Sequence, residues 1–176
     1  MKPIRLLAAF LTLAVLMTSA CALAGSKVEG YTSDYFTLSF GKGSWSDEGE
    51  FSSTSTIYTD VNANPFSAPY FVVDEREFEV DITDLDEEQI TALYDELVPQ
   101  FFSEDEAAYA NMETITINGC EARIFSYKIK SFPAAACVLV RGKRLLILSY
   151  FSGSADDAKA RKKVREAAET IQYLGE

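Results

Sequence analysis

Two consecutive apolar runs near the end of the chain constrain its fold more than any other feature. They cover Ala134 to Val140 and Arg144 to Phe151, and Arg141-Gly142-Lys143 separates them. Each run is apolar at successive positions rather than at alternate ones, which is typical of a strand that is hydrophobic on both faces. Such strands must be covered on both sides. The sequence therefore predicts a sheet that carries a packed layer on either face.

Shorter strand signals in the first half of the chain indicate that the sheet is antiparallel. Alternating or β-branched segments predict strands at Tyr35–Phe40, Thr54–Thr59, Tyr70–Val73 and Phe78–Ile82. The charged residues Asp74 to Glu77 are interpreted as an interruption between the last two. The stretch from Ser44 to Glu50 is predicted to be a loop with Trp45 as its large apolar side chain. A Ser/Thr-rich run from Ser52 to Thr56 is the one biased stretch of the sequence.

The strongest turn signal is Asn118-Gly119, which lies between a strand at Thr114–Ile117 and a returning strand at Cys120–Lys130. A type I′ turn needs positive φ at both of its central residues, and asparagine and glycine tolerate this best. The sequence therefore predicts a two-residue hairpin. Cys120 and Cys137 would lie too far apart along the sheet for a disulfide, so two free thiols are expected.

An amphipathic helix is predicted after the first group of strands. Thr83 or Asp84 is expected to cap it, and carboxylates from Asp86 to Glu88 favour the exposed amides of its first turn. Pro99 is expected to kink or end this helix. Its apolar stripe consists of Ile90, Leu93, Tyr94, Leu97 and Phe101.

Two further helices are predicted, a short one from Ser103 to Tyr109 and a closing one from Ala155 to Leu174. Together with the strands, they predict an α+β fold in which helices flank a twisted antiparallel sheet in three α/β/α layers.

The first residues of the chain are typical of an export signal. Lys2 and Arg5 precede an uncharged apolar run of 12 residues, Leu6 to Met17, which is shorter than the roughly 20 residues that a membrane-spanning helix needs. Two processing sites overlap. Cleavage after Ala22-Leu23-Ala24 would remove a signal peptide of residues 1–24, whereas Thr18-Ser19-Ala20-Cys21 resembles a bacterial lipobox, in which Cys21 would be lipidated after removal of residues 1–20.

Both alternatives leave one domain, residues 25–176, outside the cytoplasm. It would be either secreted or attached to the outer face of a membrane through Cys21. Removal of Lys2 and Arg5 from the 16 basic residues leaves 14 against 27 acidic ones, so the net charge becomes 14 − 27 = −13. Such a surface repels nucleic acid, and it leaves a lipid anchor as the expected route to a membrane.

Several chemical functions are excluded or weakened by composition and spacing. The chain has no histidine, which excludes histidine-based nucleophile systems and histidine-ligated metals. Asp60-x-Asn62-x-Asn64 resembles the opening of a calcium loop, but Pro65 and Phe71 stand where that loop needs glycine and glutamate. An Asx turn is the alternative. No catalytic, cofactor-binding or metal site is therefore predicted.

A family resemblance emerges from the order of these elements and from five segments. They are Tyr31 to Phe40 leading through a glycine loop to Trp45, the Ile117-Asn-Gly-Cys-Glu-Ala-Arg hairpin, the Gly142-Lys143-Arg144 turn, the Leu146–Tyr150 strand and the closing helix. Together they resemble the PsbP-like superfamily, over most of residues 31–174. That group spans a photosystem II extrinsic subunit, Ran-binding relatives and small exported or lipid-anchored bacterial proteins. The resemblance implies a twisted antiparallel sheet between helices, no photosynthetic role and no family catalytic residues.

Two classes of function remain open from the sequence. The first is a non-enzymatic binding or assembly module that meets a protein or envelope partner, with Trp45, Phe66, Tyr70 and Phe71 as candidate anchors. Core packing is the alternative interpretation of these aromatic residues. The second class is a small-molecule carrier or carboxylate-dependent enzyme with a pocket between sheet and helices.

Overall fold

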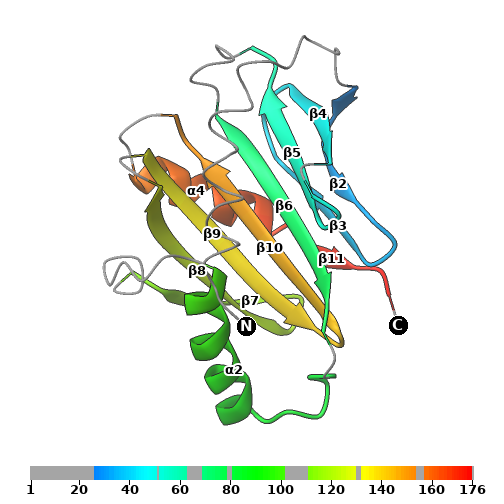
Figure 1. Cartoon of the computed structure of the whole chain (residues 1–176), viewed down its shortest axis with the longest axis vertical. Helices are drawn as coiled ribbons and strands as arrows, with labels where there is room; N and C mark the ends of the chain where they lie inside the picture. Colours follow the sequence, from blue (N-terminus) through cyan, green and yellow to red (C-terminus); the bar gives the residue numbers. More distant parts are fainter. Residues whose placement is uncertain are drawn as a thin grey trace.

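The computed structural model describes residues 26–50, 52–62, 69–78, 81–101, 111–129, 132–153 and 157–175. Within these ranges, eight strands form one antiparallel sheet (Figure 1). Their order is β1 (Lys27–Val28), β4 (Trp45–Glu50), β5 (Ser55–Asp60), β6 (Tyr70–Glu77), β10 (Arg144–Phe151), β9 (Phe132–Arg141), β8 (Cys120–Ile129) and β7 (Glu113–Ile117). A smaller antiparallel sheet has the order β11 (Gln172–Tyr173), β3 (Phe36–Ser39) and β2 (Gly30–Thr32).

Helix α4 (Asp157–Ala168) and the smaller sheet cover one face of the large sheet. Alternate residues of β8, β9 and β10 point to this side, as the period of a strand requires. The buried residues of this layer include Ile124, Cys137 and Leu148 from the strands, Val164 and Ala167 from α4, and Phe36, Leu38 and Phe40 from the smaller sheet and its end.

Helix α2 (Glu87–Phe101) covers the opposite face of the same three strands. The residues that alternate with the first set, such as Phe125, Val138 and Ile147, pack here against Tyr94 and Leu97 of the helix. Every residue from Ala134 to Val140 and from Leu145 to Phe151 is buried. The predicted three-layer α+β architecture is therefore confirmed.

Neither helix of the described part of the chain combines the length and the apolarity needed to cross a bilayer. The predicted signal segment, Cys21 and the predicted helix at 103–109 lie outside the described residues.

The predicted hairpin at Asn118-Gly119 is confirmed in detail. Asn118 has φ of 48° and Gly119 has φ of 80°, and Ile117 pairs with Cys120 across the turn. Both cysteines are free, as expected, with Cys137 buried and Cys120 half-buried. Cys137 lies opposite Ile124 in β8.

Four element predictions were wrong. The segment predicted as the strand Phe78–Ile82 has no strand at residues 78, 81 and 82, which are its described part. Trp45 to Glu50 forms strand β4 rather than a loop, because it pairs with β5 around an irregularity between Asp47 and Glu50. Strand β6 continues through the charged residues 74–77 without interruption. The closing helix ends at Ala168, and Gln172–Tyr173 instead pairs with β3 as strand β11.

Candidate functional site

A polar cleft of about 270 Å³ lies where the smaller sheet meets the larger one. One wall comes from the β2–β3 hairpin, with Tyr31 and residues 33–35, and the other comes from Glu50 and residues 52–56 at the β4–β5 turn. Glu75 of β6 contributes the carboxylate that the two hydroxyls of the first wall contact. Hydroxyl and carboxylate groups dominate the lining, so the cleft is suited to a polar ligand.

Glu75 reaches the cleft because of the two-residue period of strand β6. Phe71 and Val73 of the same strand belong to the core beneath the smaller sheet, and Glu75 continues this face where the core ends. The hydroxyl of Tyr31 donates a hydrogen bond to Oε2 of Glu75 at 2.8 Å, and the hydroxyl of Ser33 donates to the same oxygen at 2.6 Å. The carboxylate is thus held in one position by two side chains of the protein itself.

Ser33 is itself fixed by the backbone of the β2–β3 turn. Its Oγ accepts hydrogen bonds from the amides of Tyr35 at 3.2 Å and Phe36 at 3.0 Å. The amide of Ser33 donates to the carbonyl of Phe36 at 2.8 Å, which closes the turn. A serine at this position folds the hairpin and positions Glu75 at the same time.

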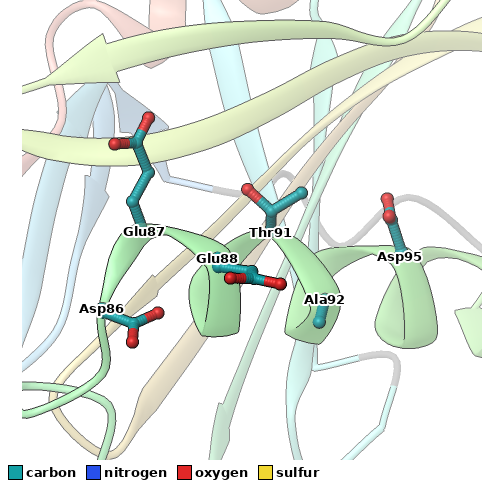
Figure 2. A pocket seen from close by; sticks show the side chains of 6 residues that line it. All are labelled: Asp86, Glu87, Glu88, Thr91, Ala92 and Asp95. Atoms are coloured by element: carbon teal, nitrogen blue, oxygen red, sulfur yellow. The ribbon is translucent and has the colours of Figure 1, made fainter.

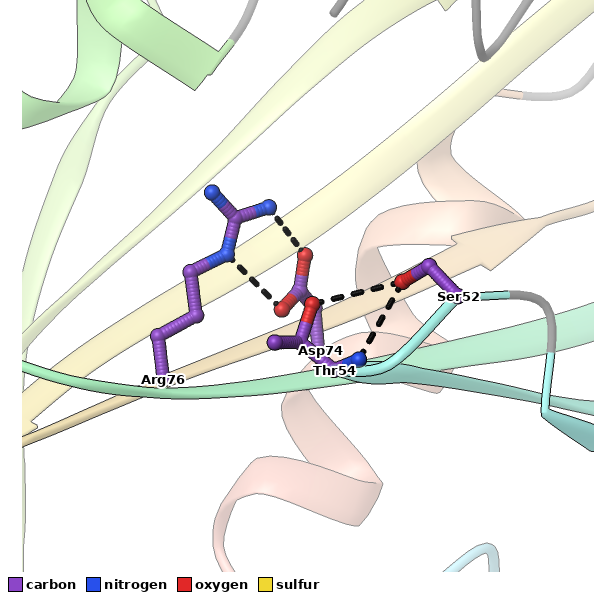
Figure 3. Close-up of polar contacts among 4 residues, drawn as sticks. All are labelled: Ser52, Thr54, Asp74 and Arg76. Carbon is purple, nitrogen blue, oxygen red and sulfur yellow. Dashed lines mark hydrogen bonds and ion pairs between the residues drawn. The ribbon is translucent and has the colours of Figure 1, made fainter.

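The opposite wall is a turn that is stabilised by its own hydroxyls (Figure 3). Ser52 Oγ accepts a hydrogen bond from the amide of Thr54 at 3.2 Å and lies 3.3 Å from its Oγ1. The carbonyl of Thr54 accepts a hydrogen bond from the amide of Glu75 at 2.9 Å. The turn is therefore joined directly to the strand that carries the carboxylate.

The lining of the cleft is negatively charged. Its ionisable side chains are the carboxylates of Asp34, Glu50 and Glu75 and the phenols of Tyr31 and Tyr35, and none of its residues is basic. Burial, together with the hydrogen bond to Glu75, raises the pKa of Tyr31 above its usual value. Tyr31 therefore stays protonated and remains a hydrogen-bond donor at neutral pH.

Two nearby arginines are directed to other partners. Arg76 pairs with Asp74, which is 6% exposed, and its Nε lies 2.9 Å from Oδ1 of that residue (Figure 3). Arg144 stacks on the ring of Tyr35 at 3.5 Å and lies 3.7 Å from Glu77. Neither side chain belongs to the cleft lining, so the carboxylates keep their excess negative charge there.

A shallow depression on α2 is also acidic, but helix capping explains it. Asp86, Glu87, Glu88 and Asp95 project from the start and outer side of this helix (Figure 2). Asp86 Oδ1 accepts a hydrogen bond from the amide of Gln89 at 2.9 Å, and Gln89 Oε1 accepts one from the amide of Asp86 at 3.0 Å. This reciprocal pair is a capping box, so Asp86 caps the helix rather than Thr83 or Asp84.

The structure does not support Trp45 and Phe71 as surface anchors. Trp45 is 2% exposed and Phe71 is fully buried, and their rings lie 4.9 Å apart. Both belong to the core beneath the smaller sheet, with Phe40 stacked on Phe71 at 4.7 Å. A Cβ at Gly43 would lie 2.6 Å from the indole Nε1, so glycine is needed there for close approach. Core packing is the correct interpretation of these two residues.

The remaining predicted residues have different outcomes. Tyr70 is half-buried and stacks on Phe151 at 4.5 Å. Phe66 and Asn64 lie outside the described residues. Asp60 Oδ1 accepts a hydrogen bond from the amide of Asn62 at 3.0 Å, which is the Asx turn given as the alternative to a calcium loop. Across the described ranges, no group of three or more acidic or cysteine side chains is placed to hold a metal ion.

The residues of the cleft were not identified from the sequence. Two signals for them were present. Residues 52–56 form the Ser/Thr-rich run, and Glu75 is part of a charged group inside an otherwise apolar strand. A charged residue within a strand, near a hydroxyl-rich turn, is the pattern that could have identified the site.

No family model and no curated protein matches the chain in sequence. The solution structure of cyanobacterial PsbP (CyanoP) from Synechocystis sp. PCC 6803 is similar, with a TM-score of 0.57 and 11% identity over 88% of this chain and 98% of that one. A crystal structure from Bacteroides thetaiotaomicron VPI-5482 gives a TM-score of 0.49 and 10% identity over 88% of this chain. This chain spans 50% of that protein.

Proposed function

We propose that the protein is a non-enzymatic binding module that works outside the cytoplasm and uses the polar cleft as its binding site. The fold is PsbP-like, as the resemblance of the sequence predicted, and at 11% identity this likeness describes the fold alone. The observation that carries the proposal is the fixed carboxylate of Glu75, which receives two hydroxyl donors at the junction of two sheets. A group fixed in this way binds a partner with little further ordering cost.

Two further observations favour binding over catalysis. The raised pKa of Tyr31 makes its phenol a poor nucleophile and a poor base. The alternative, a carrier or enzyme with a pocket between sheet and helices, needs space under α2. That interface holds Tyr94, Leu97 and Val98, each at most 5% exposed, against the strands.

The location outside the cytoplasm is supported by the amino-terminal sequence. A positively charged start, a short apolar run and two overlapping processing sites are typical of exported proteins. Intact mass spectrometry of protein purified from its own cells tests this part. A chain that begins at Gly25, or at a diacylated Cys21, is expected, and an unprocessed chain in the cytoplasm would contradict it.

Site-specific photo-crosslinking in the cells that make the protein tests the binding site. Thr54 in the cleft wall is replaced by p-benzoylphenylalanine, and Thr116, an exposed threonine on the distant edge strand β7, is replaced in the control. A discrete adduct is expected from position 54 and not from position 116. Equal adducts from both positions, or none from position 54, would exclude the cleft as the binding site.

A further inference from the structure

We infer that the turn between β9 and β10 binds a phosphate group through the guanidinium groups of Arg141 and Arg144 and the hydroxyl of Tyr173. This second site is separate from the polar cleft and goes beyond the proposed function. It is carried by three observations: the two arginines stand opposite each other, tyrosine rings hold both of them, and three sets of side-chain donors at this turn lack acceptors.

The two arginines form a pair of like charges across the hairpin (Figure 1). Arg144 lies directly opposite Arg141, and both continue the face of the sheet that carries Leu139 and Leu146. Like charges in this position are destabilising. Lys143 adds a third positive charge in the turn itself, although acidic residues outnumber basic ones in the chain by 27 to 16. A bound anion would offset this repulsion.

Two tyrosine rings hold the guanidinium groups in place. The Cζ atom of Arg144 lies 3.5 Å from the centre of the Tyr35 ring, and that of Arg141 lies 4.8 Å from the centre of the Tyr173 ring. A guanidinium that stacks on a ring keeps its N–H donors at its edge, where they can reach an oxyanion. Both side chains are therefore ordered by the protein itself, which lowers the entropic cost of binding.

The backbone of the turn is held from its other side. The amide of Phe78 donates a hydrogen bond to the carbonyl of Lys143 at 2.7 Å, and the amide of Ile82 donates to the carbonyl of Gly142 at 3.1 Å. The segment that follows β6 thus fixes the turn from which the two arginines extend. A site built on a fixed turn keeps its donors in a constant arrangement.

The side-chain donors at the turn have no acceptor of their own. A Cβ added at Gly142 would lie 3.6 Å from the hydroxyl oxygen of Tyr173, so this hydroxyl reaches the turn. Among the described residues, no acceptor lies within hydrogen-bonding distance of that hydroxyl or of the Arg141 guanidinium. Arg144 comes no closer than 3.7 Å to Glu77, whose side chain is 65% exposed. Two forks and one hydroxyl are therefore available to a ligand.

This set of donors favours phosphate over other anions. The oxygens of a phosphate point in several directions, so two guanidinium forks and a hydroxyl can each bind a different one. A carboxylate has two oxygens in one plane, for which a single fork is sufficient. The nearby carboxylates are Glu77 beside Arg144 and Asp81, which interacts electrostatically with Lys143. Two carboxylates against three cations leave the turn positive, whereas the net charge of −11 of the chain repels a polyanion.

Titration of the processed, ¹⁵N-labelled protein at constant ionic strength tests the inference. The probes are inorganic phosphate, glycerol 3-phosphate and acetate. Both phosphates are expected to shift the amide signals of residues 141–144 and 173–175 in a saturable way. Acetate should bind at least about tenfold more weakly, because it carries one charge and two coplanar oxygens.

Four variants sharpen the test. Arg141→Gln is expected to weaken phosphate binding about tenfold, since it removes one fork and one charge. Tyr173→Phe keeps the ring and should weaken binding about threefold. Lys162→Gln is the control, because it makes the same change in net charge on α4 at a side chain that is 76% exposed, and it should change the affinity less than about twofold. If Arg141→Gln disturbs the fold, Lys143→Gln in the exposed turn replaces it, with an expected loss of about two- to threefold.

A vesicle experiment distinguishes the two sources of a phosphate group. Co-sedimentation with vesicles of phosphatidylglycerol and phosphatidylcholine that inorganic phosphate competes away would assign a lipid headgroup. Saturable phosphate binding without co-sedimentation would assign a soluble phosphate compound. Three results would overturn the inference: no saturable shift from either phosphate, equal affinity for acetate, or equal losses in Arg141→Gln and Lys162→Gln. None of them affects the crosslink at position 54, so this site and the proposed function can fail independently.

Discussion

The two helices cover opposite faces of the same three strands by different means. Helix α4 packs through small side chains, with Ala160, Val164, Ala167 and Ala168 all at 0% exposure, and it contacts β8, β9, β10 and β3. Helix α2 packs through larger side chains, of which Tyr94 is the largest that is fully buried. Small residues let a helix lie close to a sheet along its length, so we expect the stabilisation by α4 to be distributed. We expect that by α2 to depend most on Tyr94, with Leu97 and Val98 buried beside it.

Tyr94 also replaces part of the sheet's own hydrogen bonding. Its hydroxyl donates to the carbonyl of Glu121 at 2.7 Å and accepts from the amide of Val140 at 2.9 Å. The regular pairing of β8 with β9 ends next to these residues, at Ala122 and Leu139. The polar contacts of α4 are more exposed, since its Arg161 binds Glu113, whose side chain is 42% exposed. The contrast between one buried anchor and a distributed contact can be tested by mutation.

The largest expected effect comes from truncating the anchor of α2. Tyr94→Ala removes a fully buried aromatic ring and both hydrogen bonds, so it should lower the free energy of unfolding by about 3–5 kcal/mol. Asp95→Ala, at the exposed neighbouring position, is the control and should change it by less than about 0.5 kcal/mol. Urea unfolding followed by circular dichroism measures both. A loss below about 1 kcal/mol would show that α2 is not held at one point.

The second expected effect is a fall in the free energy of unfolding at high pH, which comes from a buried thiol on the α4 face of the sheet. Burial under α4 raises the pKa of the Cys137 thiol from 9.0 to about 12. The unfolded chain therefore releases this proton between pH 9 and pH 12 while the folded chain keeps it. The contribution of this thiol to stability is thus fully present well below pH 9 and is lost as the pH rises towards 12. The expected loss is roughly 2.5 kcal/mol between pH 9 and pH 11 from this thiol.

A matched pair of cysteine variants isolates that contribution. Cys137→Ala should flatten the decline of the urea midpoint above pH 9, and Cys120→Ala, at the half-buried cysteine, should retain most of it. The decline should not disappear, because burial also raises the pKa of Tyr58 and of Tyr150 on the same face to about 12. Identical pH profiles for the two variants would mean that Cys137 is accessible to solvent.

The third effect tests the close approach of α4. Ala167→Leu adds three carbons where a helix lies directly on the sheet, and overpacking of this kind costs about 1–3 kcal/mol. Ala158→Leu makes the same substitution at an exposed position of the same helix and should be nearly neutral. If both variants unfold at the same urea concentration, α4 does not lie as closely as its alanines indicate.

The same contrast explains how far the sequence predicts the fold. The runs at 134–140 and 144–151 predicted a sheet covered on both faces, because apolar residues at successive positions of a strand point to both faces whatever segment lies beside it. The segment at Trp45 was predicted to be a loop because its glycine, serine and acidic residues have low strand propensity, and pairing with β5 overrides that preference. Ile171 fits the apolar stripe of a helix, yet the chain leaves the helix at Ala168 to pair with β3.

The residues of the candidate site could not be predicted from the sequence, and the reason is physical. Tyr31 is brought to Thr54 and Glu75 only by the meeting of two sheets, and local patterns contain no information on that meeting. Trp45 and Phe71, two of the predicted anchors, are large and apolar. Burial in the core is therefore more favourable for them than exposure at a binding surface. Side chains that bind at a junction of sheets are polar and scattered in sequence, whereas those that form the junction are apolar.

The smallest effect separates the ring of Tyr94 from its hydroxyl. Tyr94→Phe keeps the packing of α2 and removes only the bridge between Glu121 and Val140, so the expected loss is about 1 kcal/mol. Hydrogen exchange should locate it, with faster exchange of the Val140 amide and little change at Cys137, which lies within the β8–β9 pairing. If Tyr94→Phe lowered the free energy of unfolding as much as Tyr94→Ala does, the hydroxyl rather than the ring would hold α2 on the sheet. No loss together with a protected Val140 amide would mean that β8 and β9 close up and pair directly, so that the hydroxyl fills a gap in the sheet without stabilising it.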